Sequence, residues 1–286
     1  MSFDANAHRQ ASLQGWEEAA PGWVNRAELL RELGAPVSHW MIAAIDPQPG
    51  QRVLELAAGL GETAMLAAEL VAPIGGVIVS DQAEAMLAGA RERAHALALA
   101  NVEFHVLNAE WIDLPLASVD AVLCRWGYML MADPATALAE TRRVLRPGGR
   151  LALAVWDAIE ANPWALLPAA ELRERGIVPA ATACGQPQPG PFALADRERL
   201  RELLAQAGFA DVEIQTLDLL RRHDSFDDLW ESTLDLSRSF HDAVLAQPPE
   251  QAQAIRESLR ARFSPYEAAD GVLLVPGRTL VAAAVG

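Results

Sequence analysis

The sequence predicts a doubly wound α/β fold around a mostly parallel sheet, and three observations support this. Five short apolar runs alternate with stretches of helical periodicity over residues 52–156. The first run ends in a glycine-rich turn that leads directly into a helical stretch. Of the 286 residues, 51% are hydrophobic, enough for a sizeable core. Strands that alternate with helices form an open sheet with right-handed crossovers.

The expected core strands are short and apolar. They are residues 52–57, 76–81, 102–107, 119–124 and 149–156. A helical stretch follows the first strand through Leu70, and a second one covers residues 82–100. A third begins at Pro134, and the glycines of RPGG (146–149) are expected to end it and reverse the chain.

After Trp156 the regular alternation breaks down. Six prolines lie between Asn162 and Phe192, so a helix and an irregular loop are expected there. Residues 212–219 and 278–285 are predicted as two more strands, which gives a seven-stranded sheet. Between them, the spacing of apolar residues over 225–263 predicts two or three helices. Both insertions are expected to cover the carboxyl edge of the sheet.

The composition argues against several classes of partner and site. A formal net charge of −15 repels nucleic acid and anionic lipid. No apolar run approaches the ~18 residues of a membrane span, and no secretory h-region is seen, so a cytoplasmic protein is expected. Cys124 and Cys184 are expected to be reduced thiols. No histidine spacing suggests a metal, and the G-x-S-x-G elbow of a hydrolase is missing.

The glycine-rich turn indicates a nucleoside site. Residues 59–64 (GLGETA) fit the pattern G-x-G-x-x-G/A, which dinucleotides and other nucleosides share. Glu55 and Glu62 flank this turn, and their charges oppose a pyrophosphate. They would instead favour a ligand with an ammonium and a sulfonium, such as S-adenosylmethionine. An NAD(P)-dependent oxidoreductase and a non-catalytic nucleoside-binding protein remain the alternatives.

Several segments in order make the sequence similar to a known family. They are VLELAAGLGETA, VIVSDQAEAML, FHVLNAEWIDLP, VDAVLCRWGYML and TRRVLRPGGRLAL. Over residues 36–160 the chain thereby resembles the class I S-adenosylmethionine-dependent methyltransferases of the ubiquinone/menaquinone-biosynthesis type. The resemblance implies a Rossmann-like fold whose last strand inserts antiparallel. It also implies S-adenosylmethionine as cofactor and S-adenosylhomocysteine as product.

The resemblance also implies cofactor-binding residues. Asp81 would accept both ribose hydroxyls, Met86 would lie against the adenine, and Asn108 would accept from its exocyclic amine. The full implied set is Glu55, Ala57, Ala58, Gly59, Gly61, Asp81, Gln82, Met86, Asn108, Ala109, Glu110 and Cys124. Ala57 stands where the family often has Gly, and Asn108 where it commonly has Asp. The amide oxygen of Asn108 can still accept a hydrogen bond.

Two of these residues have a purely structural alternative. Asp81 begins the sequence DQAE, which is also the pattern of a helix-capping box. The carboxylate would then bind helix N–H groups instead of a ribose. Against this, the acid stands about 20 residues after the glycines, as a nucleoside site requires. Met86 has helical spacing and could equally be a core residue.

The expected acceptor is a small aromatic molecule such as a phenol, quinol or natural product, methylated on oxygen or carbon. The aromatic residues expected around it are Trp126, Tyr128, Trp156, Trp164, Phe192 and Trp230. His223 is the candidate general base, with a surface histidine as the alternative. Trp16 and Trp23 are expected in an N-terminal flap over the cofactor. A monomer or homodimer is expected.

The predicted organisation has three parts. They are an N-terminal helical flap (1–50), an S-adenosylmethionine-binding core (51–156), and a remainder of the core (157–286) with substrate-cap insertions at about 157–195 and 220–265.

Overall fold

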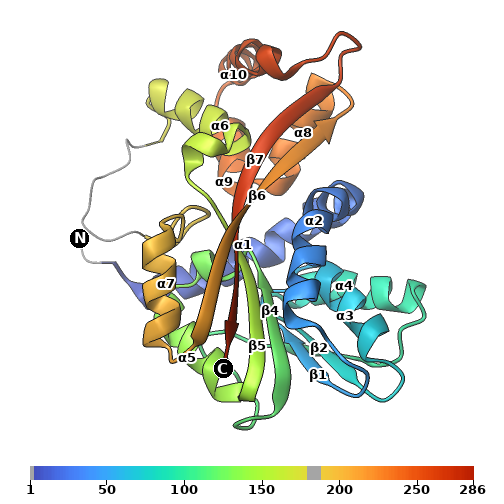
Figure 1. Ribbon diagram of the computed structural model, residues 1–286. Coiled ribbons are helices and arrows are strands. Elements are labelled where there is room, and N and C mark those ends of the chain that lie inside the picture. Colours follow the sequence, from blue (N-terminus) through green and yellow to red (C-terminus); the bar gives the residue numbers. More distant parts are fainter. Residues whose placement is uncertain (1–2, 179–187) are drawn as a thin grey trace.

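The sheet is the organising element of the computed structural model, which describes residues 3–178 and 188–286. Within these residues it has seven strands in the order β3-β2-β1-β4-β5-β7-β6 (Figure 1). The strands are β1 (Arg52–Glu55), β2 (Gly76–Asp81), β3 (Val102–Val106), β4 (Val119–Arg125), β5 (Leu145–Trp156), β6 (Ala210–His223) and β7 (Leu273–Val285). β1 to β5 pair in parallel. After β3, the chain crosses to the other side of β1, where β4 pairs with β1. The predicted fold class is confirmed.

The last strand enters the sheet antiparallel. β7 lies between β5 and β6 and runs opposite to both. Its pairing with β5 stops at Trp156↔Thr279, whereas its pairing with β6 continues to His223↔Leu273. β6 and β7 therefore leave the sheet together as a two-stranded ribbon, which is longer than the sequence predicted.

Helices cover both faces of the sheet. α2 and α3 lie on one side of it and α5 and α7 on the other (Figure 1). The helices are α1 (Ala5–Asn25), α2 (Ala27–Ile45), α3 (Glu62–Val71), α4 (Glu84–Ala96), α5 (Pro134–Val144), α6 (Pro163–Glu174), α7 (Arg197–Gln206), α8 (Phe226–Leu236), α9 (Arg238–Leu245) and α10 (Pro249–Phe263). None of the helices in the described residues combines the length and apolar content needed to cross a bilayer.

A second core stabilises the ribbon, which alone could not bury enough apolar surface. Helices α6, α8, α9 and α10 gather around its far end (Figure 1). Leu273 and Val275 of β7 are buried there against Phe226 and Phe263. We call these four helices and the ribbon the cap. For residues 225–263 two or three helices were predicted, and three are found, α8, α9 and α10.

The RPGG segment differs from its prediction. Helix α5 ends at Val144, and β5 begins at once with Leu145, so the two glycines lie inside a strand rather than in a turn. The pairing with β4 is irregular at this point. Gly148 has a φ of 77°, and its N–H donates to the carbonyl of Gly286 at 2.9 Å. Hydrogen bonds with Gly286, the residue after β7, therefore accompany the extension of β5 toward its N-terminus. Cys184 lies outside the described residues.

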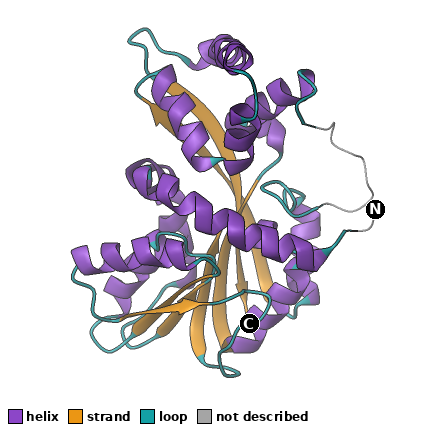
Figure 2. Ribbon diagram, turned by 180° about the vertical axis from the view of Figure 1, so that it is seen from behind, coloured by secondary structure: helices purple, strands orange, loops and turns teal. Residues whose placement is uncertain are grey.

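Helix α1 crosses the molecule between the sheet and the cap (Figure 2). At its end, Arg26 pairs with Asp228 at 2.8 Å and with Asp235 at 2.6 Å, both on α8. One turn earlier, α1 approaches α8 so closely that a Cβ on Gly22 would collide with the carbonyl oxygen of Asp235. Glycine at this position allows α1 to dock on the cap.

Two glycines of α1 give a matched test of this docking. Gly22→Ala should destabilise the protein because the new methyl group forces α1 and α8 apart. Gly15→Ala adds a methyl group into open space and should stabilise it by about 0.5–1 kcal/mol, through helix propensity alone. Chemical denaturation measures both. Equal changes in the free energy of unfolding would contradict the docking role of Gly22.

Candidate functional site

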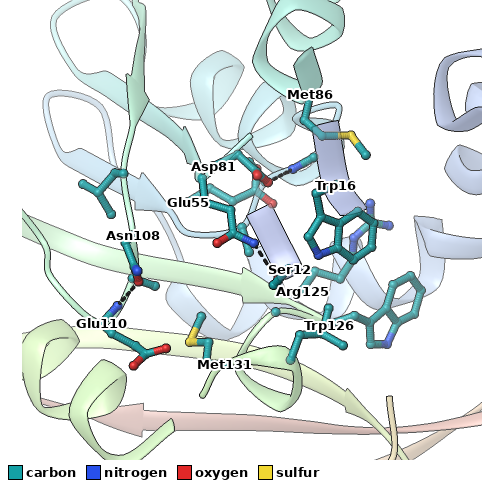
Figure 3. A pocket seen from close by; sticks show the side chains of 18 of the residues that line it. Ser12, Trp16, Glu55, Asp81, Met86, Asn108, Glu110, Arg125, Trp126 and Met131 are labelled. Carbon is teal, nitrogen blue, oxygen red and sulfur yellow. Dashed lines mark hydrogen bonds between the residues drawn. The ribbon is translucent and has the colours of Figure 1, made fainter. Parts of the chain in front are cut away.

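A pocket lies at the carboxyl ends of the parallel strands, the usual place for a ligand in this architecture (Figure 3). Glu55 ends β1, Asp81 ends β2 and Arg125 ends β4, and all three line the pocket. Asn108 follows β3 and lines it too. The opposite wall comes from α1. The residues of α1 in the lining are His8, Arg9, Ser12, Trp16 and Trp23.

The two glycines of the first loop have different surroundings. Both have a positive φ, 55° at Gly59 and 76° at Gly61, which glycine adopts without strain. A Cβ on Gly59 would meet only the ring of Trp23, at 3.9 Å, so the backbone there is open to a ligand. A Cβ on Gly61 would lie 2.9 Å from Met65 and 3.3 Å from Ala90. Gly61 thus serves the packing of α3, and it does not line the pocket.

Asp81 joins two loops through its carboxylate. One oxygen accepts from the N–H of Gly59 at 2.9 Å and the other from that of Ala83 at 3.0 Å. Burial raises the pKa of Asp81, because the ionised form loses hydration. The capping-box alternative does not describe this helix, since α4 begins at Glu84 with Ala83 as its N-cap.

The N-terminus of α4 is bound by α1 instead. The carboxylate of Glu17 accepts from the N–H of Glu84 at 2.7 Å and of Ala85 at 3.1 Å. This leaves Asp81 facing the pocket with lone pairs to spare for a ligand's hydroxyl groups.

Two buried acids and one half-buried arginine lie beside the glycine loop. Glu55 accepts from the N–H of Ala64 at 2.8 Å, and burial raises its pKa to about 7. Glu62 pairs with Arg93 at 3.2 Å, but its other carboxylate oxygen, Oε1, has no hydrogen-bond partner in the described structure. The Nη1 of Arg125 is also buried without one. An amino acid carries an ammonium and a carboxylate, so the methionine part of S-adenosylmethionine fits this set of donors and acceptors.

Helix α1 is attached to the pocket rim by polar contacts. The Nε of Arg9 donates to Glu110 at 3.0 Å, and the Nε2 of His8 lies 3.0 Å from the carbonyl of Leu130. The Oγ of Ser12 accepts from the Nε2 of Gln82 at 2.9 Å. Sequence reasoning identified Trp16 and Trp23 as a flap but missed these three α1 residues, because their partners are at least 70 residues away along the chain. It also missed Arg125, although its position directly before Trp126 at a strand end was a usable signal.

The structure brings most of the predicted cofactor-binding residues together. Those in the lining are Glu55, Ala57, Ala58, Gly59, Asp81, Gln82, Met86, Asn108, Ala109 and Glu110. Asn108 also accepts from the N–H of Glu110 at 2.8 Å, which orients its side chain. Besides Gly61, Cys124 lies outside the lining. Burial raises the pKa of its thiol to about 12, so it is an inert core residue.

The predicted acceptor residues are more dispersed. Only Trp126 lines the pocket, with an unusual φ of 59°. It stacks on Trp156 with ring centres 4.3 Å apart and planes 11° from parallel. Trp156 then contacts Trp164 at 4.9 Å, and Trp164 contacts Phe192 at 6.1 Å. These four residues form what we call the aromatic row, which leads from the pocket toward the cap.

The other three candidates lie away from the pocket lining. Tyr128 is buried, with its hydroxyl 2.7 Å from that of Thr141. Trp230 packs edge-on against Phe240 in the cap core. His223 is buried at the end of β6, and its Nδ1 lies 3.2 Å from a carboxylate oxygen of Asp228. Burial lowers the pKa of His223.

Comparison with known proteins decides the family. A family model described as a methyltransferase domain matches residues 47–208. The chain belongs to this family. That membership confirms the predicted family, and S-adenosylmethionine as the type of cofactor. In residues 3–178 and 188–286, no three His, Cys, Asp or Glu side chains are grouped so that they could hold a metal ion.

Individual relatives are similar over parts of their length. The chain is 38% identical to a 37.1 kDa protein in transposon TN4556 of Streptomyces fradiae, over 55% of this chain and 47% of that protein, or about half its length. It is 32% identical to the ubiquinone/menaquinone biosynthesis C-methyltransferase UbiE of Acidiphilium cryptum, over 62% of this chain and 73% of that enzyme. The YcgJ protein of Bacillus subtilis shares the fold, with a TM-score of 0.57 at 19% identity over 87% of this chain and 97% of that one.

Removing the Asp81 carboxylate tests the ribose position. Asp81→Ala should weaken S-adenosylhomocysteine binding by about 1.5–3 kcal/mol, the range for a hydrogen bond to a charged group. It should also lower the melting temperature, because the N–H of Gly59 loses its acceptor. Calorimetry measures the affinity, with Asp113→Ala, an exposed residue outside the pocket lining, as control. A lower melting temperature with unchanged affinity would leave Asp81 a purely structural role.

The raised pKa of Glu55 predicts a pH dependence of cofactor binding. Below about pH 7 its carboxyl group is protonated in the free protein, and a bound cation favours the ionised form. Affinity for S-adenosylmethionine should therefore fall as the pH drops below about 7, by up to about tenfold per unit, while binding of uncharged adenosine stays level. Calorimetry from pH 5.5 to 8.5 on wild type and Glu55→Gln checks this. An unchanged pH dependence in the variant would assign it to another group.

Proposed function

We propose that this protein transfers a methyl group from S-adenosylmethionine to a small aromatic acceptor. The observation that carries the proposal is the composition of the pocket. The lining brings together one open glycine, Gly59, buried acids, and an arginine with an unpartnered nitrogen, Arg125. This arrangement complements a zwitterionic amino acid joined to a nucleoside.

The proposed cofactor pose follows from the chemistry of each wall. The ammonium would lie near Glu55 or Glu62, and the carboxylate near Arg125. The ribose would bind Asp81, and the adenine would lie between Met86 and the loop at Asn108. Trp16 of α1 would cover the nucleoside from the opposite side. When bound, the cofactor supplies an electrophilic methyl group on its sulfonium.

Trp126 marks the proposed acceptor side. It lines the pocket beside Arg125 and begins the aromatic row. Trp156 stacks on the Trp126 ring, and the guanidinium of Arg125 lies over that ring at 5.0 Å. An aromatic acceptor would therefore meet Trp126 at its edge, an arrangement that contributes about 0.5–1.5 kcal/mol beyond burial. The similarity to UbiE supports a quinol as one such acceptor. Methyl transfer needs alignment of the nucleophile and exclusion of water more than it needs specific catalytic groups.

The buried acids also argue against a nicotinamide dinucleotide. A pyrophosphate at the start of α3 would meet Glu62, in the first helical turn. S-adenosylhomocysteine should therefore bind in calorimetry at least about tenfold more tightly than NAD or NADP, which corresponds to about 1.4 kcal/mol. Tighter binding of a dinucleotide would refute the proposal and favour an oxidoreductase.

A labelled-methyl assay tests the acceptor class. Phenols, quinols and polyketide-like aromatics should accept label from S-adenosylmethionine, while protein and nucleic acid should not. Trp126→Ala should lower kcat/KM for the acceptor while leaving cofactor affinity within about threefold, because Trp126 contributes a wall and no polar contact to the cofactor. The matched control is Trp111→Ala, a surface tryptophan beyond the pocket. Loss of cofactor affinity with normal use of the acceptor would contradict the assignment.

A further inference from the structure

Arg221 is a half-buried arginine for which the described residues supply no counter-ion. It lies in β6, opposite Val275 of β7, at the start of the ribbon that carries the cap. Its Nε is buried and has no hydrogen-bond partner, and no described residue forms an ion pair with its guanidinium. Burial alone lowers its pKa to about 9. A guanidinium nitrogen that is cut off from water, as this Nε is, normally has a hydrogen-bond partner.

The rest of the chain does not supply that acid. Residues 1–2 and 179–187, which the structure does not describe, contain no aspartate or glutamate. Its neighbour Arg222 gives the contrast, because it is exposed and forms an ion pair with Asp224. These two consecutive arginines lie on opposite faces of one strand, and of the two only Arg222 is paired with an acid.

The guanidinium of Arg221 lies on the aromatic row. Its central carbon is 3.8 Å from the ring centre of Trp164 and 5.5 Å from that of Trp156. Trp156 in turn stacks on Trp126, which lines the pocket. Stacking occupies one face of the guanidinium and leaves the N–H groups at its edge to bind an anion.

We infer that Arg221 binds an anionic group of the methyl acceptor, and that this group is a carboxylate on an aromatic ring seated against the aromatic row. The inference rests on the proposed function. A guanidinium matches a planar carboxylate through two parallel hydrogen bonds, and the adjoining tryptophans suit the ring that carries it. Arg221 is thereby a specificity-determining residue, which selects aromatic acids over neutral aromatics of the same size.

The test compares three probes that share one ring. 4-Hydroxybenzoate, phenol and phenyl phosphate are titrated into protein saturated with S-adenosylhomocysteine, and quenching of tryptophan fluorescence reports binding next to the row. Wild type should bind 4-hydroxybenzoate about tenfold to a hundredfold more tightly than phenol, as expected for a buried charge-assisted contact. Arg221→Met should remove this preference, and Arg221→Lys should restore it in part. Arg222→Met should retain it fully.

Other results would overturn the inference. Equal binding of 4-hydroxybenzoate and phenol by wild type, or a preference that survives in Arg221→Met, excludes Arg221 as the carboxylate site. Tightest binding of phenyl phosphate would replace the carboxylate with a phosphate ester. An unchanged melting temperature and an unchanged S-adenosylhomocysteine affinity show that Arg221→Met is folded. If S-adenosylhomocysteine itself fails to bind to wild type, the proposed function fails, and the same titrations without it still test Arg221.

Discussion

The carboxylate of Asp81 holds together the two loops on which the pocket depends. It accepts one N–H from the glycine loop after β1 and one from the turn after β2. These two backbone contacts fix the distance between the loops, so Gly59 stays open in its left-handed conformation. The same carboxylate also faces the pocket, so the group that joins the two loops can bind a ligand as well.

Helix α1 completes the site from outside the sheet. It donates and accepts hydrogen bonds at the loops after β2, β3 and β4, and it also docks on the cap through Arg26. The pocket and the cap are therefore connected through one helix. The aromatic row makes a second link, from Trp126 in the pocket to Trp164 beside the cap core. An acceptor bound along this row would contact both parts of the protein.

The sequence predicted the core well, because hydrophobic periodicity and glycine turns are local signals. All seven strands were placed, and the loop residues after β1, β2 and β3 come together as the resemblance implied. Predictions were wrong or incomplete where contacts between residues far apart in the sequence decide the structure. The RPGG segment became part of β5, where Gly286, the residue after β7, forms hydrogen bonds with Gly148 and Gly149. β6 and β7 form a long ribbon because the cap helices cover it.

The same distinction holds for the site. Tyr128 follows β4 as Trp126 does, yet its side chain is buried in the core, where its hydroxyl group forms a hydrogen bond with that of Thr141. No sequence pattern reveals which of two such aromatics turns toward a ligand. The contacts of α1 and the isolation of Arg221 likewise depend on tertiary packing. His223 stays a prediction as a base, although its carboxylate neighbour Asp228 already pairs with Arg26.

A crystal structure with S-adenosylhomocysteine tests the central claim most directly. It should show both ribose hydroxyls hydrogen-bonded to Asp81 and the amino-acid carboxylate at Arg125, with α1 still closed over the nucleoside. Density that places the ribose away from Asp81, or the amino-acid carboxylate against Glu55 and Glu62, would contradict the account.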